Sequence, residues 1–330
     1  MLLKHLSELR GISGQEKEVK SFINDEIEGH CDKIWTDHLG NLYARTNGRS
    51  DVDIGLFAHM DEVGFMVTGI DGHLLNFDAV GGINEEVMPG TVLEVGDERV
   101  PGVIGCPPIH LQKKEEAEKK IPIDDLRIDI GDVNDGIQIG DAATFDTRYK
   151  ERRGLALGKA FDDRIGCYCL IEAIKADLDV SCTYVFTTQE EVGIRGSQVA
   201  SNNLSCEYAI ACEGTFSLDQ PGVPKEDKVQ AMGGGPVITI TDRSVITDAR
   251  LRGTIIKAAE SCGMPYQLKR PFTGGTDAGM VHLSGMGVPS CVISTSCKFI
   301  HSPCAMASLE DIKNSRRLLI ESILSVSGGL

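Results

Sequence analysis

The chain has 330 residues, and its 33 basic and 49 acidic side chains give a formal net charge of −16 at pH 7. This excess of negative charge argues against nucleic acid or a membrane as a partner, because phosphate-rich surfaces attract basic proteins. The 41% hydrophobic and 25% charged content is ordinary for a globular protein, and the length is sufficient for two domains.

The first 65 residues predict two helices followed by strands. Leucines recur at helical spacing over residues 1–9 but are interrupted by charged residues, so this segment resembles neither a signal sequence nor a membrane span. The sequence SGQE at residues 13–16 is typical of a capping box and predicts a helix that continues through Ile27. Three strands are then expected, at residues 33–36, 41–45 and 53–58.

Residues from about 66 to 154 differ in pattern from the rest of the chain. Short alternating segments and many glycines replace helical periodicity, and Asp71-Gly72 is typical of a hairpin turn. The charged run from Lys113 to Lys120 predicts an exposed loop or a short helix. We therefore predict a small inserted β domain at residues 66–154, within an α/β domain made of residues 1–65 and 155–330.

From residue 155 onward, predicted helices and strands alternate. Helices are expected at residues 163–175, 194–201, 248–262 and 308–325. Strands are expected at residues 182–188, 208–212, 236–241, 266–269 and 289–294. This order favours an α/β fold with a mixed, mainly parallel central sheet flanked by helices. Ligands of such sheets gather at the carboxyl ends of the strands.

Histidines and carboxylates stand at the edges of separate apolar segments, where the topology rule would bring them together. The candidates are His59, Asp61, Asp162, Glu190, Glu191, Glu213 and His301. Taken singly, a strand-end histidine is more often an ordinary packed residue, and Asp162 has an alternative role as a helix N-cap. Taken together, two imidazoles and three carboxylates form a ligand set that suits zinc, cobalt or manganese, and this set does not resemble a thiolate-rich structural zinc site.

Two pairs of candidates have spacings with a direct structural meaning. Residues two apart on a strand share a face, so the carboxylate of Asp61 is placed to hold the imidazole of His59. The neighbouring charges of Glu190 and Glu191 repel each other at the end of a buried strand unless cations or water relieve them. Neighbours on extended backbone point in opposite directions, so one of the two can contact metal while the other faces the attacking water.

Five motifs, in order through nearly the whole chain, resemble the dinuclear metalloaminopeptidases that include the tetrahedral, deblocking and glutamyl aminopeptidases. They are AHMDEVG at 58–64, GKAFDDR at 158–164, TQEEVG at 188–193, GGTDA at 274–278 and IHSP at 300–303. The resemblance implies that His59 and Glu213 bind one metal ion. It also implies that Glu191 and His301 bind a second ion and that Asp162 bridges the two.

The same resemblance gives roles to the remaining candidates. Glu190 falls on the general base and Asp61 on the carboxylate behind the first histidine, whereas the motif at 274–278 receives no catalytic role. Position 213 departs from the family, in which aspartate is expected, and the extra methylene bears on metal spacing and affinity there. The implied cofactors are two divalent ions, zinc or cobalt or else manganese.

The implied activity is removal of N-terminal residues from short peptides by a hydroxide held between the two metal ions. Glu190 would take the proton of the attacking water and deliver it to the leaving amine. The resemblance also implies that the inserted β domain mediates dimer formation and that dimers can assemble into a tetrahedral dodecamer. The preferred N-terminal residue is not readable, because pocket walls come from loops without a motif.

Other functions compete with this one. A glycan hydrolase also uses two carboxylates, but it leaves His59 and His301 without a role. A catalytically impaired assembly or binding protein on the same fold is a second alternative, and a cysteine hydrolase is the least favoured. Eleven scattered cysteines predict reduced thiols and a cytoplasmic location.

Overall fold

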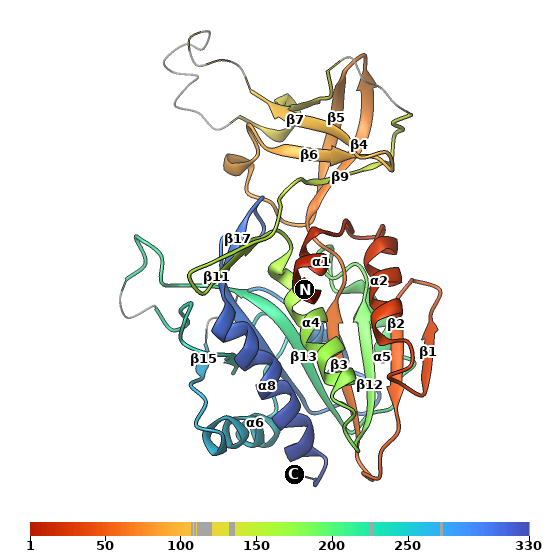
Figure 1. The fold of residues 1–330 in the computed structure, drawn as a ribbon, viewed down its shortest axis with the longest axis vertical. Coiled ribbons are helices and arrows are strands. Elements are labelled where there is room, and N and C mark those ends of the chain that lie inside the picture. The colour runs from red at the N-terminus through yellow and green to blue at the C-terminus, as the bar shows by residue number, and fades with distance from the viewer. Residues whose placement is uncertain are drawn as a thin grey trace.

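Figure 1 shows a computed structural model of the chain, which describes residues 1–106, 108, 110, 121–131, 136–224, 228–270 and 273–329. The described residues form a large mixed sheet with helices on both faces and, beyond one end of it, a small closed barrel. The predicted loop or helix at Lys113–Lys120 lies outside the described residues.

The large sheet has the strand order β1-β2-β12-β3-β13-β16-β17-β11-β10, with β14 beside β16 and β15 beside β14. Its strands are β1 (Lys33–Thr36), β2 (Leu42–Thr46), β3 (Asp53–His59), β10 (Lys150–Arg152), β11 (Leu155–Gly158), β12 (Ser181–Thr187), β13 (Tyr208–Phe216), β14 (Val237–Thr239), β15 (Gln267–Lys269), β16 (Ser290–Lys298) and β17 (Ala305–Ser308). The four central strands β12, β3, β13 and β16 are parallel. Apart from the β14–β15 pair, the outer strands pair antiparallel, so the sheet is mixed and parallel only at its centre.

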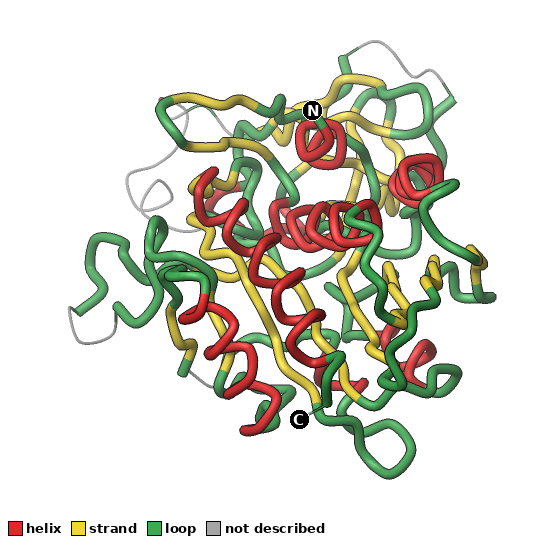
Figure 2. Tube along the Cα trace, turned by 60° about the horizontal axis from the view of Figure 1, so that its bottom comes forward, coloured by secondary structure: helices red, strands yellow, loops and turns green. Residues whose placement is uncertain are grey.

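Helices cover both faces of this sheet because its central strands are apolar on both sides. Leu56 and Ala58 of β3 pack in one core cluster, whereas Phe57 between them packs in another. The first face carries α1 (Leu2–Glu8), α2 (Lys17–Ile27), α4 (Phe161–Lys175), α6 (Ala249–Ser261) and α8 (Leu309–Val326). The second face carries α5 (Arg195–Ser201) and α7 (Ala278–Val281). Figure 2 shows the longer helices together on one side of the strands.

The small barrel is formed by the strands β4, β5, β8, β7, β6 and β9, in that order. Their bounds are β4 (Gly64–Asp71), β5 (Leu74–Val80), β6 (Val92–Val95), β7 (Val100–Gly105), β8 (Arg127–Asp129) and β9 (Ala142–Phe145), with short 3-10 turns η1 (Glu85–Val87) and η3 (Ile123–Asp125). The predicted hairpin is present, because β4 and β5 pair and Gly72 between them has a φ of 61°. Phe65 fills the barrel core and meets Phe77 and Phe145 edge-on, at 5.1 and 5.6 Å between ring centroids. The barrel strands thus run from Gly64 to Phe145, and β10 pairs in the large sheet.

Two strands near the centre extend beyond their predicted ends. The strands predicted at 208–212 and 289–294 continue to Phe216 and Lys298, because they pair in parallel with each other along their whole length. Glu213 therefore lies within a strand, and not at its end. The final helix is preceded by β17, which separates it from the His301 loop.

The predicted capping box at residues 13–16 is wrong. Glu16 is the N-cap residue of α2 and makes no side-chain cap hydrogen bond. The hydroxyl of Ser13 instead donates to Oδ2 of Asp61 at 2.6 Å. A tertiary hydrogen bond to a buried carboxylate has replaced the local one that the sequence pattern suggests.

Candidate metal centre

His59 is the last residue of the buried strand β3, at the carboxyl end of the parallel strands. Its Nδ1 lies 3.1 Å from the carbonyl oxygen of Asp61 and 3.4 Å from Oδ1 of the same residue. Because both neighbours are acceptors, the proton of the neutral ring belongs on Nδ1. The lone pair of Nε2 then faces Asp162, whose Oδ1 is 3.3 Å away.

Asp162 lies between the two histidines. Its Oδ2 is 3.5 Å from Nε2 of His301, on the other side of the carboxylate from His59. The residue stands at the start of α4, where the backbone is not yet helical. The adjacent Asp163 has a different role, since its carboxylate accepts the peptide N–H groups of Gly166 and His59.

Glu190 and Glu191 lie in the turn that follows β12, as the sequence predicts. Their peptide N–H groups donate to the two carboxylate oxygens of Asp61, at 3.0 and 3.1 Å. Their side chains diverge: Oε2 of Glu190 lies 4.0 Å from Nε2 of His59, and Oε1 of Glu191 lies 3.4 Å from Nε2 of His301. Oε1 of Glu191 is buried and accepts no hydrogen bond from the described residues.

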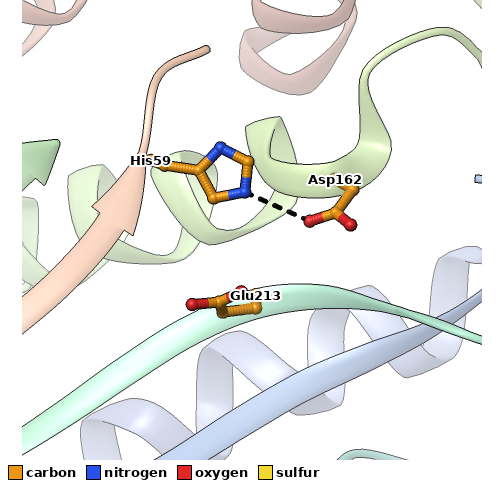
Figure 3. Close-up of side chains that lie close together, drawn as sticks. All are labelled: His59, Asp162 and Glu213. Carbon is orange, nitrogen blue, oxygen red and sulfur yellow. Dashed lines mark hydrogen bonds and ion pairs between the residues drawn. The ribbon is translucent and has the colours of Figure 1, made fainter. Parts of the chain in front are cut away.

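Glu213 faces His59 and Asp162 from β13, as Figure 3 shows. Its Oε1 accepts the peptide N–H of Asp277 at 3.0 Å. Asp277 is fully buried, and its Oδ2 accepts the hydroxyl of Thr187 at 2.5 Å. The motif at 274–278, which the sequence left without a role, thus holds the carboxylate of Glu213 by a main-chain hydrogen bond that no side-chain pattern reveals.

A glycine beside Glu213 permits the close approach of Asp162. A Cβ atom at Gly214 would lie 2.9 Å from the Cα of Asp162 and 3.0 Å from its nitrogen, closer than real Cβ contacts come. The start of α4 can therefore lie directly on β13. This contact brings the carboxylate of Asp162 to the edge of the sheet.

His301 comes from the loop after β16, and a residue of the barrel segment holds its ring. Nδ1 donates to the carbonyl oxygen of Gly82 at 2.8 Å, which directs Nε2 at Asp162 and Glu191. The side chain of His301 is 34% exposed, whereas that of His59 is 1% exposed. The second histidine is therefore the more accessible of the two.

The electrostatics of the cluster indicate unbalanced negative charge. Burial raises the pKa of Glu190 and Glu213 well above the ordinary value, and that of Glu191 to about 7. Burial opposes protonation of His301, but the hydrogen bond to Asp162 and the charge of Glu191 outweigh it and raise its pKa to about 9. Burial likewise opposes the ionised form of Asp162, yet hydrogen bonds to both histidines keep its pKa below the ordinary value.

These residues fit divalent cations. Two groups each bring their ligand atoms within 4.8 Å of one another, His59 with Asp162 and Glu213, and Asp162 with Glu191 and His301. Asp162 belongs to both groups, so one carboxylate can serve two ions. Imidazole and carboxylate donors suit zinc and its neighbours among the transition metals. Oε1 of Glu191, which accepts no hydrogen bond from the described residues, is an available ligand atom.

The cluster opens into a cavity of about 490 Å³. Its lining includes Asp162, Glu190, Glu191, Glu213 and His301, together with Phe216, Arg243, Ser244, Lys269, Thr276 and Ile300. The predicted metal ligands therefore border a space large enough for a small ligand.

The cysteines do not suit nucleophilic chemistry at this site. All eleven are free thiols. The Sγ of Cys167 donates to the His59 carbonyl oxygen at 3.1 Å. Burial raises the pKa of this thiol well above its ordinary value, which disfavours the reactive thiolate.

In the part of the chain that the structure describes, no helix has the length and apolar character of a membrane span.

The sequence profile of the M42 glutamyl aminopeptidase family matches residues 40–318 of the chain. A curated protein from Acetivibrio thermocellus, provisionally named an aminopeptidase, is 37% identical over 98% of this chain and 97% of its own length. The lysyl aminopeptidase of Pyrococcus furiosus is 30% identical over 96% of this chain and 94% of its own length.

Solved structures agree with these relatives. A TET aminopeptidase from a marine sediment archaeon of the Thaumarchaeota has a TM-score of 0.93 at 33% identity, over 99% of this chain and 97% of that one. A TET peptidase of Pyrococcus horikoshii, described as able to assemble into a tetrahedron or a large octahedral shell, has a TM-score of 0.85 at 32% identity, over 97% of both chains. A protein of Thermotoga maritima named an endoglucanase has a TM-score of 0.82 at 35% identity, over 99% of both chains.

Proposed function

The chain belongs to the M42 glutamyl aminopeptidase family and is an aminopeptidase, and we propose that its metal ligands are His59, Asp162, Glu191, Glu213 and His301. The observation that carries this proposal is the position of Asp162, which belongs to both three-residue groups. The two groups would hold two divalent ions, zinc or cobalt or else manganese, with Asp162 between them. When bound, such ions lower the pKa of water towards neutrality and polarise the scissile carbonyl.

Glu190 is the proposed general base. It lies beside the ligands, 4.0 Å from Nε2 of His59, yet belongs to neither three-residue group. Its carboxylate is therefore free to accept a proton from the attacking water and to donate it to the leaving amine. Asp61 would orient His59 and the turn that carries the two glutamates, because its carboxylate contacts His59 and accepts the peptide N–H groups of Glu190 and Glu191.

The acidic lining of the cavity accounts for cleavage at the N-terminus. A peptide's free α-amino group is a cation at neutral pH and is attracted to the carboxylates around Asp162. A peptide bound in this way presents its first amide bond to Glu190. The proposed substrates are short peptides.

The assembly is a homo-oligomer in the related TET peptidases, and we extend this to the chain as a proposal. The domain predicted at residues 66–154, which contains most of the barrel strands, would form the dimer contact, and residues 1–65 and 155–330 would form the catalytic domain, whose sheet also includes β10. Dimers would then be building blocks of a tetrahedral dodecamer in the cytoplasm. Size-exclusion chromatography with light scattering measures both levels of assembly.

A metal analysis combined with two substrates tests the proposed activity. Protein purified without added metal is expected to contain two divalent ions per chain, to hydrolyse aminoacyl amides and to lose this activity on chelation. Return of activity with zinc, cobalt or manganese would support the ligand set. A protein without metal that binds peptides would indicate an impaired homologue. Polysaccharide hydrolysis that survives chelation would instead indicate a glycosidase, as the name of the Thermotoga maritima protein suggests.

A further inference from the structure

The turn that carries Glu190 is held by side chains from other segments of the chain. The four consecutive peptide N–H groups of residues 188–191 all donate to oxygen atoms of buried side chains. Asn41 accepts the first at 2.9 Å, Glu16 accepts the second at 3.1 Å, and Asp61 accepts the other two. Because buried N–H groups need an acceptor, these three side chains determine where the turn lies.

Glu16 contacts the residue directly before the proposed base. Its Oε1 accepts the peptide N–H of Gln189 and, at 2.6 Å, that of Gly14 in its own loop. Gln189 has a φ of 55°, a left-handed backbone conformation that is unfavourable for a residue with a side chain and persists only where the surroundings enforce it. The hydrogen bond to Glu16 is one of the contacts that enforce it, and the chain continues from this residue into Glu190.

The loop that carries Glu16 is anchored to the connection between β3 and β4. The peptide N–H of Glu62 donates to the carbonyl oxygen of Gly11 at 2.8 Å, and the peptide N–H of Gly11 donates to Oε1 of Glu62 at 3.2 Å. Two residues further along the loop, the hydroxyl of Ser13 donates to the carboxylate of Asp61. The turn with the proposed base is therefore tied, through this loop, to the same connection that follows the strand of the first histidine.

Stability alone does not favour a carboxylate at position 16. Glu16 is 6% exposed, and its side chain does not cap the helix α2 that it precedes. Burial, and after it the negative charge of Asp61, raise the pKa of Glu16 to about 7, so the ionised form is disfavoured there. A residue that opposes stability in this way is typical of a functional site, and the contact with Gln189 shows which function it can serve.

We propose that Glu16 is a positioning residue for the general base: it accepts the peptide N–H of Gln189 and so fixes the backbone from which the carboxylate of Glu190 reaches the attacking water. This inference rests on the proposed function, because Glu190 is the proposed base. Glu16 belongs to neither three-residue ligand group, so it acts through the turn and not through the metal ions. A displacement of a catalytic group by about 1 Å can lower the rate roughly 100-fold, so a distant hydrogen bond of this kind can matter to turnover.

Two substitutions at position 16 test the proposal in the metal-loaded protein, with aminoacyl amides as substrates. Glu16→Met has a similar length but no oxygen acceptor, and its kcat is expected to fall roughly 10- to 100-fold while KM and metal content stay near wild type. Glu16→Gln keeps an acceptor oxygen without the charge, so its kcat should fall less, and its free energy of unfolding should not fall, because the repulsion by Asp61 is relieved. Glu28→Met, at an exposed position after α2, is the matched control and should leave kcat unchanged.

Hydrogen–deuterium exchange separates this proposal from the proposed function, because it needs no turnover. The amides of residues 188–191 should exchange roughly 5- to 100-fold faster in Glu16→Met than in wild type, as the loss of a buried acceptor implies, and at the wild-type rate in Glu28→Met.

Three results would overturn the proposal: wild-type exchange at these amides in Glu16→Met, a wild-type kcat in this variant, or a fall in kcat that is matched by a loss of metal ions. An inactive wild-type protein would reject the proposed function alone, and exchange would still decide whether Glu16 holds the turn. If Glu16→Met fails to fold, Glu16→Asp, whose shorter side chain withdraws the acceptor, is compared with Glu16→Gln and gives the same decision.

Discussion

Asp61 contacts His59 through two of its oxygens, the carbonyl at 3.1 Å and Oδ1 at 3.4 Å from the same ring nitrogen. The carboxylate also accepts the hydroxyl of Ser13 and the peptide N–H groups of the two glutamates after β12. A single buried side chain thus fixes one histidine and the turn that carries Glu190 and Glu191. The pKa of Asp61 lies below its ordinary value, because contacts with His59 and Ser13 outweigh the effect of burial.

Replacing Asp61 with asparagine tests this relationship. Asparagine has one carboxamide oxygen in place of two carboxylate oxygens, so at least one peptide N–H of the turn loses its acceptor. We expect roughly 10- to 100-fold weaker metal binding and a loss of about 1–3 kcal/mol in the free energy of unfolding. Metal titration and denaturant unfolding measure the two effects. Asp51→Asn, at an exposed position, is the control, and wild-type metal affinity in Asp61→Asn would contradict the assigned role.

Glu190→Gln removes the proposed proton acceptor while keeping the shape of the side chain. Because Glu190 belongs to neither ligand group, the variant is expected to retain both metal ions and the fold. Hydrolysis of aminoacyl amides should fall by roughly 100- to 10,000-fold, the usual contribution of general acid–base catalysis. Turnover is measured beside elemental analysis of the same preparation. Near-normal turnover would show that Glu190 is not the base.

His301→Ala is expected to empty one metal position. The group of Asp162, Glu191 and His301 loses its only imidazole, whereas the group containing His59 keeps all three members. The predicted result is one strongly bound ion per chain and the loss of most activity. Elemental analysis after dialysis gives the count, and His282→Ala, outside both groups, is the control. Retention of both ions would refute the assignment of His301.

Gly214→Ala tests the packing of the Asp162 segment against β13. The added Cβ would meet the backbone of Asp162 at 2.9 to 3.0 Å, so the start of α4 must move. We expect a loss of about 1–3 kcal/mol in the free energy of unfolding, as for overpacked cores, and a larger loss of metal affinity than of stability. Gly253→Ala, within α6 and with open space at its Cβ, should instead stabilise by roughly 0.5–1 kcal/mol. Thermal unfolding and metal titration of both variants make the comparison, and wild-type metal affinity in Gly214→Ala would show that the close approach is unimportant.

Most of the candidate site could be predicted from the sequence, because charged residues at strand ends converge in a sheet with parallel central strands. His59, Asp162, Glu190, Glu191 and His301 stand at such ends or in the following turns, and the structure brings them together. Glu213 converges with them from within a strand, because pairing between β13 and β16 extends that strand beyond its apolar run. The sequence predicted a mixed, mainly parallel sheet but not which strands run antiparallel, since alternation of helices and strands does not specify the direction of edge strands.

The hydrogen bonds that hold the site residues in place could not be predicted from the sequence. Gly82 contributes only a carbonyl oxygen and Asp277 a peptide N–H, so neither contact depends on a side chain that a motif could show. The sequence predicts a local capping contact for Ser13, but in the fold its hydroxyl donates to the distant Asp61.

The hydrogen bond from His301 to Gly82 ties the reaction centre to a strand connection of the barrel. A rotation of the barrel relative to the sheet would turn the imidazole away from Asp162. If the barrel forms the proposed dimer contact and the centre holds the proposed ions, subunit association and ion binding would therefore be coupled equilibria, and each would change the affinity of the other by the same factor.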